Sequence, residues 1–265
     1  MNPSDIDLEK LLRRLHLPTV SRLYAGYATR AATEGWSHRD FLALLVAEEV
    51  AHRNDTRIQK AARRAHFPFI KTIENFDFLF QSSLRLQRLG PYLGPELVTE
   101  GRNLILSGKP GRGKTHLAVA IAYRAIQNGF TARFAGASAL IDELGAASRE
   151  GRLRDATAEW VVPDVLVVDE IGYLHYAEDA ANVLFGVVDQ RYLARKPIVF
   201  TTNKKLRDWG DVLHDHDLAE VILDRVLEHG EHVALGGPSW RTKHVDPDTL
   251  GDLGADPESV REPPP

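Results

Sequence analysis

The clearest chemical signal in the sequence is the run Gly108-Lys109-Pro110-Gly111-Arg112-Gly113-Lys114-Thr115, which His116 follows. Glycines allow successive backbone N–H groups to turn inward around a phosphate, and a helix that starts there adds its positive N-terminal end. Lys114 is expected to reach the β- and γ-phosphates, and the Thr115 hydroxyl to complete the coordination of Mg²⁺. A glycine-rich turn that binds nothing is the alternative. The apolar run before it and the helical pattern after it favour a site for ATP or a related triphosphate.

A pair of carboxylates provides the second chemical signal. Asp169 and Glu170 directly follow the apolar run Val165-Leu166-Val167-Val168, which predicts a buried strand. Asp169 would hold Mg²⁺ through its water shell, and Glu170 would orient or deprotonate the attacking water. Two acids that cap the next loop are the alternative. Beside a phosphate-binding loop, the pair favours hydrolysis of the nucleotide over its storage.

Three further polar residues stand where the chain leaves predicted elements. Asn203 follows the apolar run 198–202, at a strand end where it would polarise the attacking water. Arg225 and Arg241 stand as the chain leaves the last helix and the last strand, and an arginine supplied by a neighbouring subunit accelerates hydrolysis in other enzymes of this chemistry. A plain turn at Asn203 and surface or structural roles for both arginines remain open.

The pattern around these residues predicts an α/β fold. Short apolar runs alternate with helical stretches, which is typical of a parallel sheet covered on both faces. Strands are expected at 103–107, 131–134, 165–169 and 198–202, with a weaker one at 233–235. Helices are expected at 114–128, 138–147, 180–194 and 218–228.

Residues 5–66 instead predict helices throughout, because apolar residues recur at helical spacing. A first helix carries Leu8 to Leu15 and ends before Pro18, and a second covers 20–32. The third begins at a Ser37 cap, completed by Asp40, and continues towards residue 66. The chain therefore divides into a small helical domain at 1–68, an α/β domain at 69–243 and a tail at 244–265.

Basic residues recur on the third predicted helix at spacings of four, three and four, so that they share one face. We call them the basic stripe: Arg53, Arg57, Lys60 and Arg64. No aromatic residue is interleaved, so the stripe favours contact with a nucleic-acid backbone over base recognition. A weaker basic cluster is expected in the loop after the second α/β helix, at Arg149, Arg152 and Arg154. A solvated helix face is the alternative for the stripe.

Composition excludes several classes of protein. The chain has no cysteine, which rules out disulfides, thiolate metal sites and a cysteine nucleophile. No secretory signal or membrane-spanning run is visible, so a cytoplasmic location is expected. The net charge is −4, yet residues 1–70 carry 11 Lys and Arg against 8 Asp and Glu, and residues 244–265 carry 1 against 6. The basic part suggests a nucleic-acid partner, and the acidic tail is predicted to be disordered.

The order of motifs resembles that of the IstB-type transposition helper ATPases of bacterial insertion sequences. The resemblance covers residues 8–243. Its motifs are Leu11-Leu12-Arg13-Arg14-Leu15-His16-Leu17-Pro18, Glu48-Glu49, the segment 67–78 (FPFIKTIENFDF), the phosphate loop, 168–173 (VDEIGY), Thr201-Thr202-Asn203 and Ser239-Trp240-Arg241. Trp240 departs from the family, which more often has tyrosine there, and the acidic tail has no counterpart.

This resemblance implies an AAA+ fold, that is, a P-loop NTPase of the ASCE class with a five-stranded parallel sheet, related to the helicase loader DnaC and to the initiator DnaA. Asn203 then matches sensor 1, Arg225 the arginine finger that acts on a neighbouring subunit, and Arg241 sensor 2. Phe76 matches the family's linker beside the adenine.

The implied function is ATP-dependent self-assembly on duplex DNA, deformation of that DNA, and delivery of a target site to a cognate transposase that stimulates hydrolysis. A DnaC-like helicase loader is the main alternative, although the basic helical segment followed by residues 67–72 favours the transposition helper. A metabolic P-loop kinase would leave the helical domain and Arg225 and Arg241 without a role.

Overall fold

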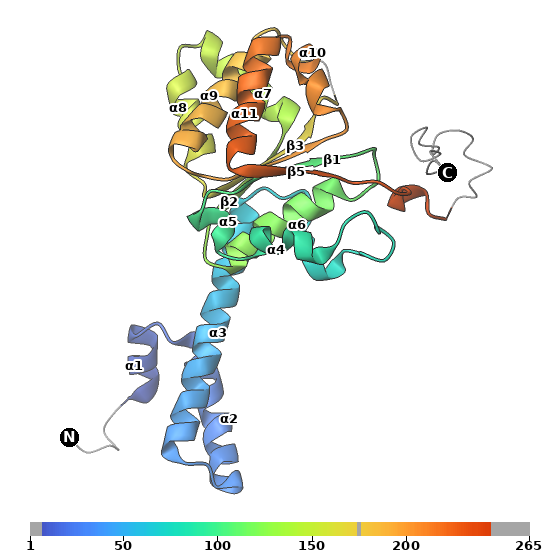
Figure 1. Cartoon of the computed structure of the whole chain (residues 1–265). Helices are drawn as coiled ribbons and strands as arrows, with labels where there is room; N and C mark the ends of the chain where they lie inside the picture. The colour runs from blue at the N-terminus through green and yellow to red at the C-terminus, as the bar shows by residue number, and fades with distance from the viewer. Residues whose placement is uncertain (1–6, 174–175, 245–265) are drawn as a thin grey trace, which may run out of the picture. The chain divides into compact units, whose positions relative to one another are not determined.

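The structure is a computed structural model that describes residues 7–173 and 176–244 (Figure 1). The chain divides into two compact units, Met1–Lys60 and Ala61–Pro265. The end of the third helix thus belongs to the second unit, where the carbonyl of Ala65 accepts a hydrogen bond from the backbone N–H of Phe134 at 2.8 Å. Apart from His244, the acidic tail predicted from the sequence lies outside the described residues.

The first unit consists of α1 (Leu8–Arg14), α2 (Pro18–Glu34) and most of α3 (His38–Arg64). The predicted cap of the third helix is confirmed, because the Ser37 hydroxyl accepts from the backbone N–H of Asp40 at 3.2 Å and donates to its carboxylate at 2.6 Å. Pro18 does more than end a helix. It is the first residue of α2, where its fixed φ suits the first turn and its missing N–H costs nothing.

The second unit is built on a five-stranded parallel sheet with the order β2-β3-β4-β1-β5. All five predicted strands are present. They are β1 (Asn103–Ser107), β2 (Ala132–Gly136), β3 (Val165–Ile171), β4 (Ile198–Thr202) and β5 (Gly230–Ala234). Every residue of β1 and β4 is buried, which explains why both read as continuous apolar runs in the sequence.

Helices cover both faces of this sheet (Figure 1). On one face lie α4 (Leu86–Leu93), α5 (Glu96–Thr99) and α6 (Lys114–Gln127). On the other lie α7 (Ala137–Arg149), α8 (Leu153–Val161), α9 (Ala180–Leu193), α10 (Trp209–Leu213) and α11 (His216–Glu228). The predicted helices are α6, α7, α9 and α11, whereas the shorter helices were not predicted. Short 3-10 helices at Ile73–Asn75, Leu206–Asp208 and Trp240–Thr242 complete the described elements.

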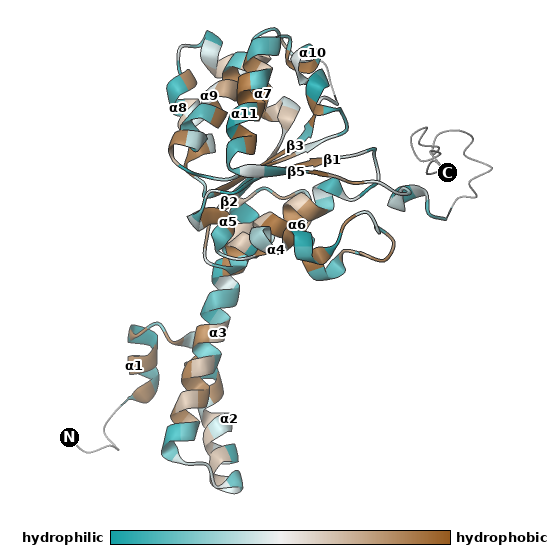
Figure 2. Ribbon diagram, in the orientation of Figure 1, coloured by the Kyte–Doolittle hydropathy of each residue, from teal (hydrophilic) through white to brown (hydrophobic). Residues whose placement is uncertain are grey.

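Apolar residues concentrate on the strands and on the helices beside them (Figure 2). A large core cluster fills the space between the sheet and α7 to α11 and includes Trp160, Phe200 and Trp209. Phe200 and Trp209 meet edge to face with ring centroids 5.6 Å apart. This core fixes the strand ends from which the polar residues of the site project.

Arg191 on α9 is fully buried within this core. Its guanidinium donates to main-chain carbonyl groups on two neighbouring segments, at 2.8–3.4 Å. The acceptors are the carbonyls of Trp160, Val161, Pro163, Asp164 and Pro197. Arg191 thereby joins the chain that enters β3 to the chain that enters β4.

Among residues 7–173 and 176–244, no helix is both long and apolar enough to cross a membrane.

Candidate nucleotide site

The phosphate loop connects β1 to α6, as the sequence predicts. Its glycines take conformations that other residues rarely adopt, with φ of 146° at Gly108, 77° at Gly111 and 87° at Gly113. Space is also short, since a Cβ at Gly108 would lie 2.5 Å from the carbonyl oxygen of Leu235. The glycines are therefore required by backbone conformation and by close packing together.

Lys114 begins α6 and is buried. Its Nζ donates to the carbonyl oxygens of Gly108 at 2.6 Å and Lys109 at 3.0 Å, so the ammonium lies inside the loop. Burial lowers the pKa of Lys114, and the nearby carboxylates of Asp169 and Glu170 oppose this shift. The side chain is held where a phosphate on the loop would meet a positive charge.

Asp169 is buried at the end of β3, next to the first turn of α6. Its carboxylate accepts from the hydroxyls of Thr115 at 3.0 Å and Thr201 at 2.5 Å. Burial raises the pKa of Asp169 because these neutral hydroxyls compensate its charge only in part. A carboxylate and a hydroxyl are hard oxygen ligands, so Thr115 and Asp169 fit the magnesium site predicted for them.

Glu170 stands at an irregularity in β3. The register pairs Val168 with Phe200 and then Ile171 with Thr202, so the bonding to β4 shifts between these pairs. Glu170 has φ of 63°, in the left-handed region that costs a non-glycine residue about 1–3 kcal/mol. While Asp169 is buried, the side chain of Glu170 is exposed and lines the cavity described next. Strain and a shifted register at the end of a strand are typical of functional sites.

A cavity of about 420 Å³ lies over the phosphate loop. It brings together residues predicted from distant parts of the sequence: Phe76, residues 110–116, Glu170, Asn203 and Arg241. Gly108, Lys109 and Asp169 lie outside its lining, although they contact Lys114 and Thr115, which line it. Four strand ends and the segment before α4 thus converge on one volume.

The aromatic side of this cavity was largely missed from the sequence. Phe69, Phe80 and Trp240 line it together with Phe76. Phe76 packs edge to face on His116, with ring centroids 5.2 Å apart, and Phe80 does the same on Trp240 at 5.0 Å. Burial lowers the pKa of His116, which favours its neutral form. This wall suits the flat apolar faces of a nucleoside base.

Two segments brace the phosphate loop from outside. The backbone N–H of Trp240 donates to the carbonyl of Gly111 at 2.9 Å, and Arg112 donates to the carbonyl of Leu235 at 2.9 Å. Gln81, which the sequence analysis did not identify, donates to the carbonyl of Arg112 at 3.0 Å. These contacts place Arg241, next to Trp240, at the cavity.

Comparison with known proteins agrees with this geometry. The family model described as IstB-like ATP binding protein matches residues 10–246. The chain belongs to this family. The ATP-binding protein of insertion sequence IS5376 from Geobacillus stearothermophilus is 35% identical over 236 residues, which cover 89% of this chain and 94% of the relative. The resemblance predicted from the motifs is therefore confirmed.

Solved structures confirm the fold class of this IstB-like chain. AMPPCP-bound DnaA from Aquifex aeolicus superposes with a TM-score of 0.51 at 20% identity, covering 64% of this chain and 51% of that one. The DnaC helicase loader gives a TM-score of 0.50 at 22% identity, covering 66% of this chain and 99% of that one. The second unit has the fold of an AAA+ P-loop domain. ATP binding is the property by which the family is described, and ATPase activity is consistent with this fold.

Arg225 of the IstB-like chain does not line its own cavity. It lies on α11, where it forms an ion pair with Asp189 of α9. Its guanidinium also lies over the rings of Phe185, at 4.7 Å, and Tyr192, at 5.6 Å. A role on a neighbouring subunit therefore stays a prediction.

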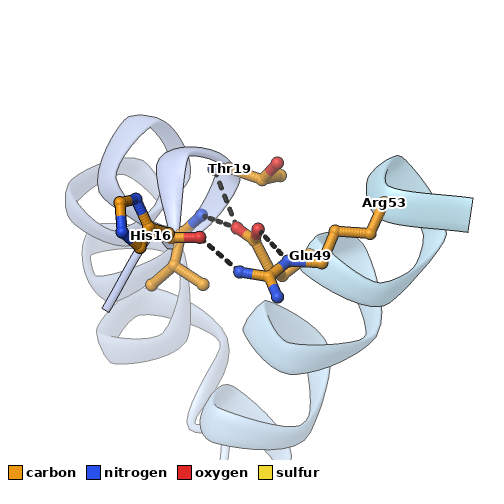
Figure 3. A network of polar contacts seen from close by, with 5 residues as sticks. His16, Thr19, Glu49 and Arg53 are labelled. Carbon is orange, nitrogen blue, oxygen red and sulfur yellow. Dashed lines mark hydrogen bonds and ion pairs between the residues drawn. The ribbon is translucent and has the colours of Figure 1, made fainter. Parts of the chain in front are cut away.

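The residues of the basic stripe all lie on α3. Arg53 also has a structural role, because its Nε pairs with Glu49 at 2.9 Å and it donates to the carbonyl of His16 (Figure 3). Glu49 in turn accepts from the backbone N–H groups of Thr19 at 2.9 Å and Val20 at 3.2 Å, at the start of α2. Arg57 donates to Asn54 at 3.0 Å, and Lys60 and Arg64 are exposed.

The weaker basic cluster does not form the loop that the sequence predicts. Arg149 is the last residue of α7, 4.0 Å from Asp179, and Arg154 lies within the unpredicted helix α8. Arg152 precedes α8 and pairs with Glu150 at 2.5 Å. The loop assignment holds for Arg152, but it was wrong for Arg149, because α7 extends to this residue, and for Arg154, because residues 153–161 form a short amphipathic helix.

Proposed function

We propose that this IstB-like protein hydrolyses ATP, assembles as a homo-oligomer on duplex target DNA, remodels that DNA and recruits or activates a transposase. The observation that carries the ATPase part is the cavity, where the phosphate loop, Glu170, Asn203 and Arg241 meet. Neither a glycine-rich turn nor a simple nucleotide store requires a strained carboxylate beside a loop lysine.

The residues divide the work of hydrolysis by position. The loop N–H groups and Lys114 hold the β- and γ-phosphates, and Arg241 adds positive charge at the same cavity. The oxygen of the attacking water bonds to the γ-phosphorus while the bond between this phosphorus and the β-phosphate oxygen breaks. Glu170 accepts the proton that the water loses. Asn203 orients that water. Thr115 and Asp169 would hold Mg²⁺, which neutralises charge on the phosphates when bound.

The DNA and transposase parts have different support. The relative described above is named as the ATP-binding protein of an insertion sequence, which connects the family to transposition. Arg57, Lys60 and Arg64 expose positive charge along α3, and charge of this kind follows a phosphate backbone without regard to sequence. The family's role and this surface together favour duplex DNA as the partner.

The first experiment measures phosphate release and particle mass on one sample, with and without duplex DNA, in ATP and in ADP. We expect a large assembly in ATP plus DNA, with an altered hydrolysis rate. Glu170→Gln should bind ATP and form the assembly but stop turnover. A monomer that hydrolyses ATP and ignores DNA would instead favour the helicase-loader alternative, and normal turnover by Glu170→Gln would remove the catalytic assignment.

A second experiment tests the stripe. The double variant Arg57→Gln/Lys60→Gln should bind DNA more weakly at every sequence and reduce the slope of log affinity against log salt by about 2, about 1 for each lost phosphate contact. The control Arg22→Gln/Arg39→Gln removes the same charge from exposed positions of the first unit. Equal effects of the two variants would show that only net charge matters and that the stripe is a solvated face.

A further inference from the structure

We propose that Tyr176 is a positioning residue that holds Glu170 in its strained conformation for hydrolysis. This inference rests on the proposed role of Glu170. It adds a residue that does not line the cavity and that the sequence motifs do not include.

The backbone turns at residues 170–172, where β3 ends, and this turn needs support from outside the strand. The shifted register and the positive φ of Glu170 take this part of the backbone out of the regular ladder with β4. Gly172 has φ of 87°, so two left-handed residues flank Ile171. Backbone groups that leave a ladder need other partners if they are buried. Left alone, a strained turn of this kind would relax towards a regular strand and carry the Glu170 side chain with it.

The Tyr176 hydroxyl bridges the two ends of this turn. It accepts from the backbone N–H of Gly172 at 3.0 Å and donates to the carbonyl of Glu170 at 3.3 Å. The tyrosine is itself fixed, since only 8% of it is exposed, it belongs to the large core cluster, and its carbonyl lies 3.2 Å from Nε2 of His214. Burial raises the pKa of Tyr176, so the hydroxyl keeps the proton that it donates.

Two threonines of β4 hold the same turn from the other side. The Thr201 hydroxyl accepts from the backbone N–H of Glu170 at 2.9 Å, and the Thr202 hydroxyl donates to the carbonyl of Ile171 at 2.7 Å. Thr201 also contacts Asp169, so a change there would disturb the predicted metal ligand as well. The Tyr176 hydroxyl bonds to Glu170 and Gly172 and, within the described residues, makes no hydrogen bond to Asp169, so Tyr176 is the cleaner residue to test.

The test is Tyr176→Phe, which removes one oxygen and keeps the ring in the core. We expect kcat for ATP hydrolysis to fall by about 10-fold to 100-fold, because a displacement of about 1 Å can cost about 10²-fold in rate. The Kd for ATP, measured by titration without turnover, should change by less than about 2-fold, since the phosphate loop is untouched.

Tyr192→Phe is the matched control. Its hydroxyl donates to the carboxylate of Glu228 at 2.6 Å, whereas that of Tyr176 donates to a main-chain carbonyl, and Tyr192 lies on α9 outside the cavity. This variant should keep the wild-type kcat. Wild-type kcat in Tyr176→Phe, or an equal loss in both variants, would overturn the proposal, and so would a parallel loss of ATP affinity.

A double variant separates this inference from the function on which it rests. If Tyr176 acts through Glu170, adding Tyr176→Phe to Glu170→Gln should cause no further loss of the residual rate of phosphate release, measured over a long incubation at high enzyme concentration. A further loss of the size seen in Tyr176→Phe alone would show that the tyrosine acts elsewhere. Normal turnover by Glu170→Gln alone would instead contradict the proposed function and leave the fold unaffected.

Discussion

A carboxylate is buried in each of the two units, and the pKa values of the two groups are shifted in opposite directions. Asp169 in the α/β unit accepts from two neutral hydroxyls, and burial raises its pKa. For Glu49 in the helical unit, burial alone would also raise the pKa. There the hydrogen bonds from Arg53, Val20 and Thr19 outweigh burial, and the pKa is lowered.

The difference distinguishes a completed structural contact from a site that can still bind a cation. Glu49 has a guanidinium and two backbone N–H groups, so its negative charge is already compensated. Among the described residues, the hydrogen bonds to Asp169 come from hydroxyls, and the nearby ammonium of Lys114 offsets its charge only in part, so the carboxylate can still bind a cation. Of two buried acids, the one without charged or backbone donors is the better candidate for function.

The largest expected effect comes from Asp169→Asn, which keeps the shape and removes the charge. ATP turnover should fall by at least about 100-fold, in line with the loss of a group that acts on the transferred phosphate. Stability should be kept or should rise, because a carboxylate with incomplete compensation no longer has to be buried. Phosphate release and thermal unfolding measure the two effects. If turnover were retained and stability lost, Asp169 would have a structural role, as Glu49 has.

Arg191 in the α/β unit has many main-chain partners, yet burial lowers its pKa to about 9, and Arg191→Met tests whether its contacts are structural as those of Glu49 are. The change leaves carbonyl groups on two segments without their donor, so unfolding should become easier by about 3 kcal/mol. Denaturant unfolding measures the loss. Arg207→Met, at a largely exposed arginine, is the control and should change stability by less than about 0.5 kcal/mol.

Glu49→Gln should destabilise the helical unit by about 1–2 kcal/mol, since it weakens the bonds to Arg53 and to the start of α2. Hydrogen exchange at the backbone N–H groups of Thr19 and Val20 should become faster. The adjacent Glu48→Gln is the control, because within the described residues the Glu48 carboxylate accepts one hydrogen bond, from the Tyr27 hydroxyl at 3.3 Å. If Glu49→Gln lowered ATP turnover measured without DNA, the contrast between a structural Glu49 and a functional Asp169 would be wrong.

Acid should produce the smallest of these effects, seen at Glu49 in the helical unit. The pKa of Glu49 is lower in the folded protein than its ordinary value of 4.5, so its contribution is fully present above that value. It is lost as pH falls through the lowered pKa. Thr19 and Val20 should stay protected from exchange at pH 5 and lose protection below pH 4.5, whereas in Glu49→Gln the protection should not change over this interval.

Much of the nucleotide site could be predicted because its chemistry is local in sequence. The phosphate loop and the Asp169–Glu170 pair each follow an apolar strand directly, so pattern and position agree. All five strands were predicted, since strands buried on both faces read as apolar runs. The predicted helices in the same unit are long and periodic, and those that were missed have nine residues or fewer.

The remaining contacts depend on packing between distant segments. Gln81 bonds to the distant carbonyl of Arg112, whereas the Tyr176 hydroxyl makes two bonds within one turn, to Gly172 and Glu170, and no sequence pattern marks either residue. The partnership of Arg53 with Glu49 was visible as a spacing of four, but the basic residues around it favoured a nucleic-acid role instead. Charge periodicity identifies a face of a helix and does not distinguish a contact within the protein from a contact with a partner.

The bracing of the phosphate loop has a consequence for synthesis of the chain. Gln81 and Trp240 come from opposite ends of the second unit, and both bond to the loop between them. The loop residues are made early, but the edge strand β5 and the segment that carries Trp240 and Arg241 are among the last residues of this unit to be translated. Domains tend to fold as units during synthesis. A nascent or truncated chain that ends before β5 would therefore carry every glycine of the loop without a finished cavity, so ATP would bind only after this domain has been made in full.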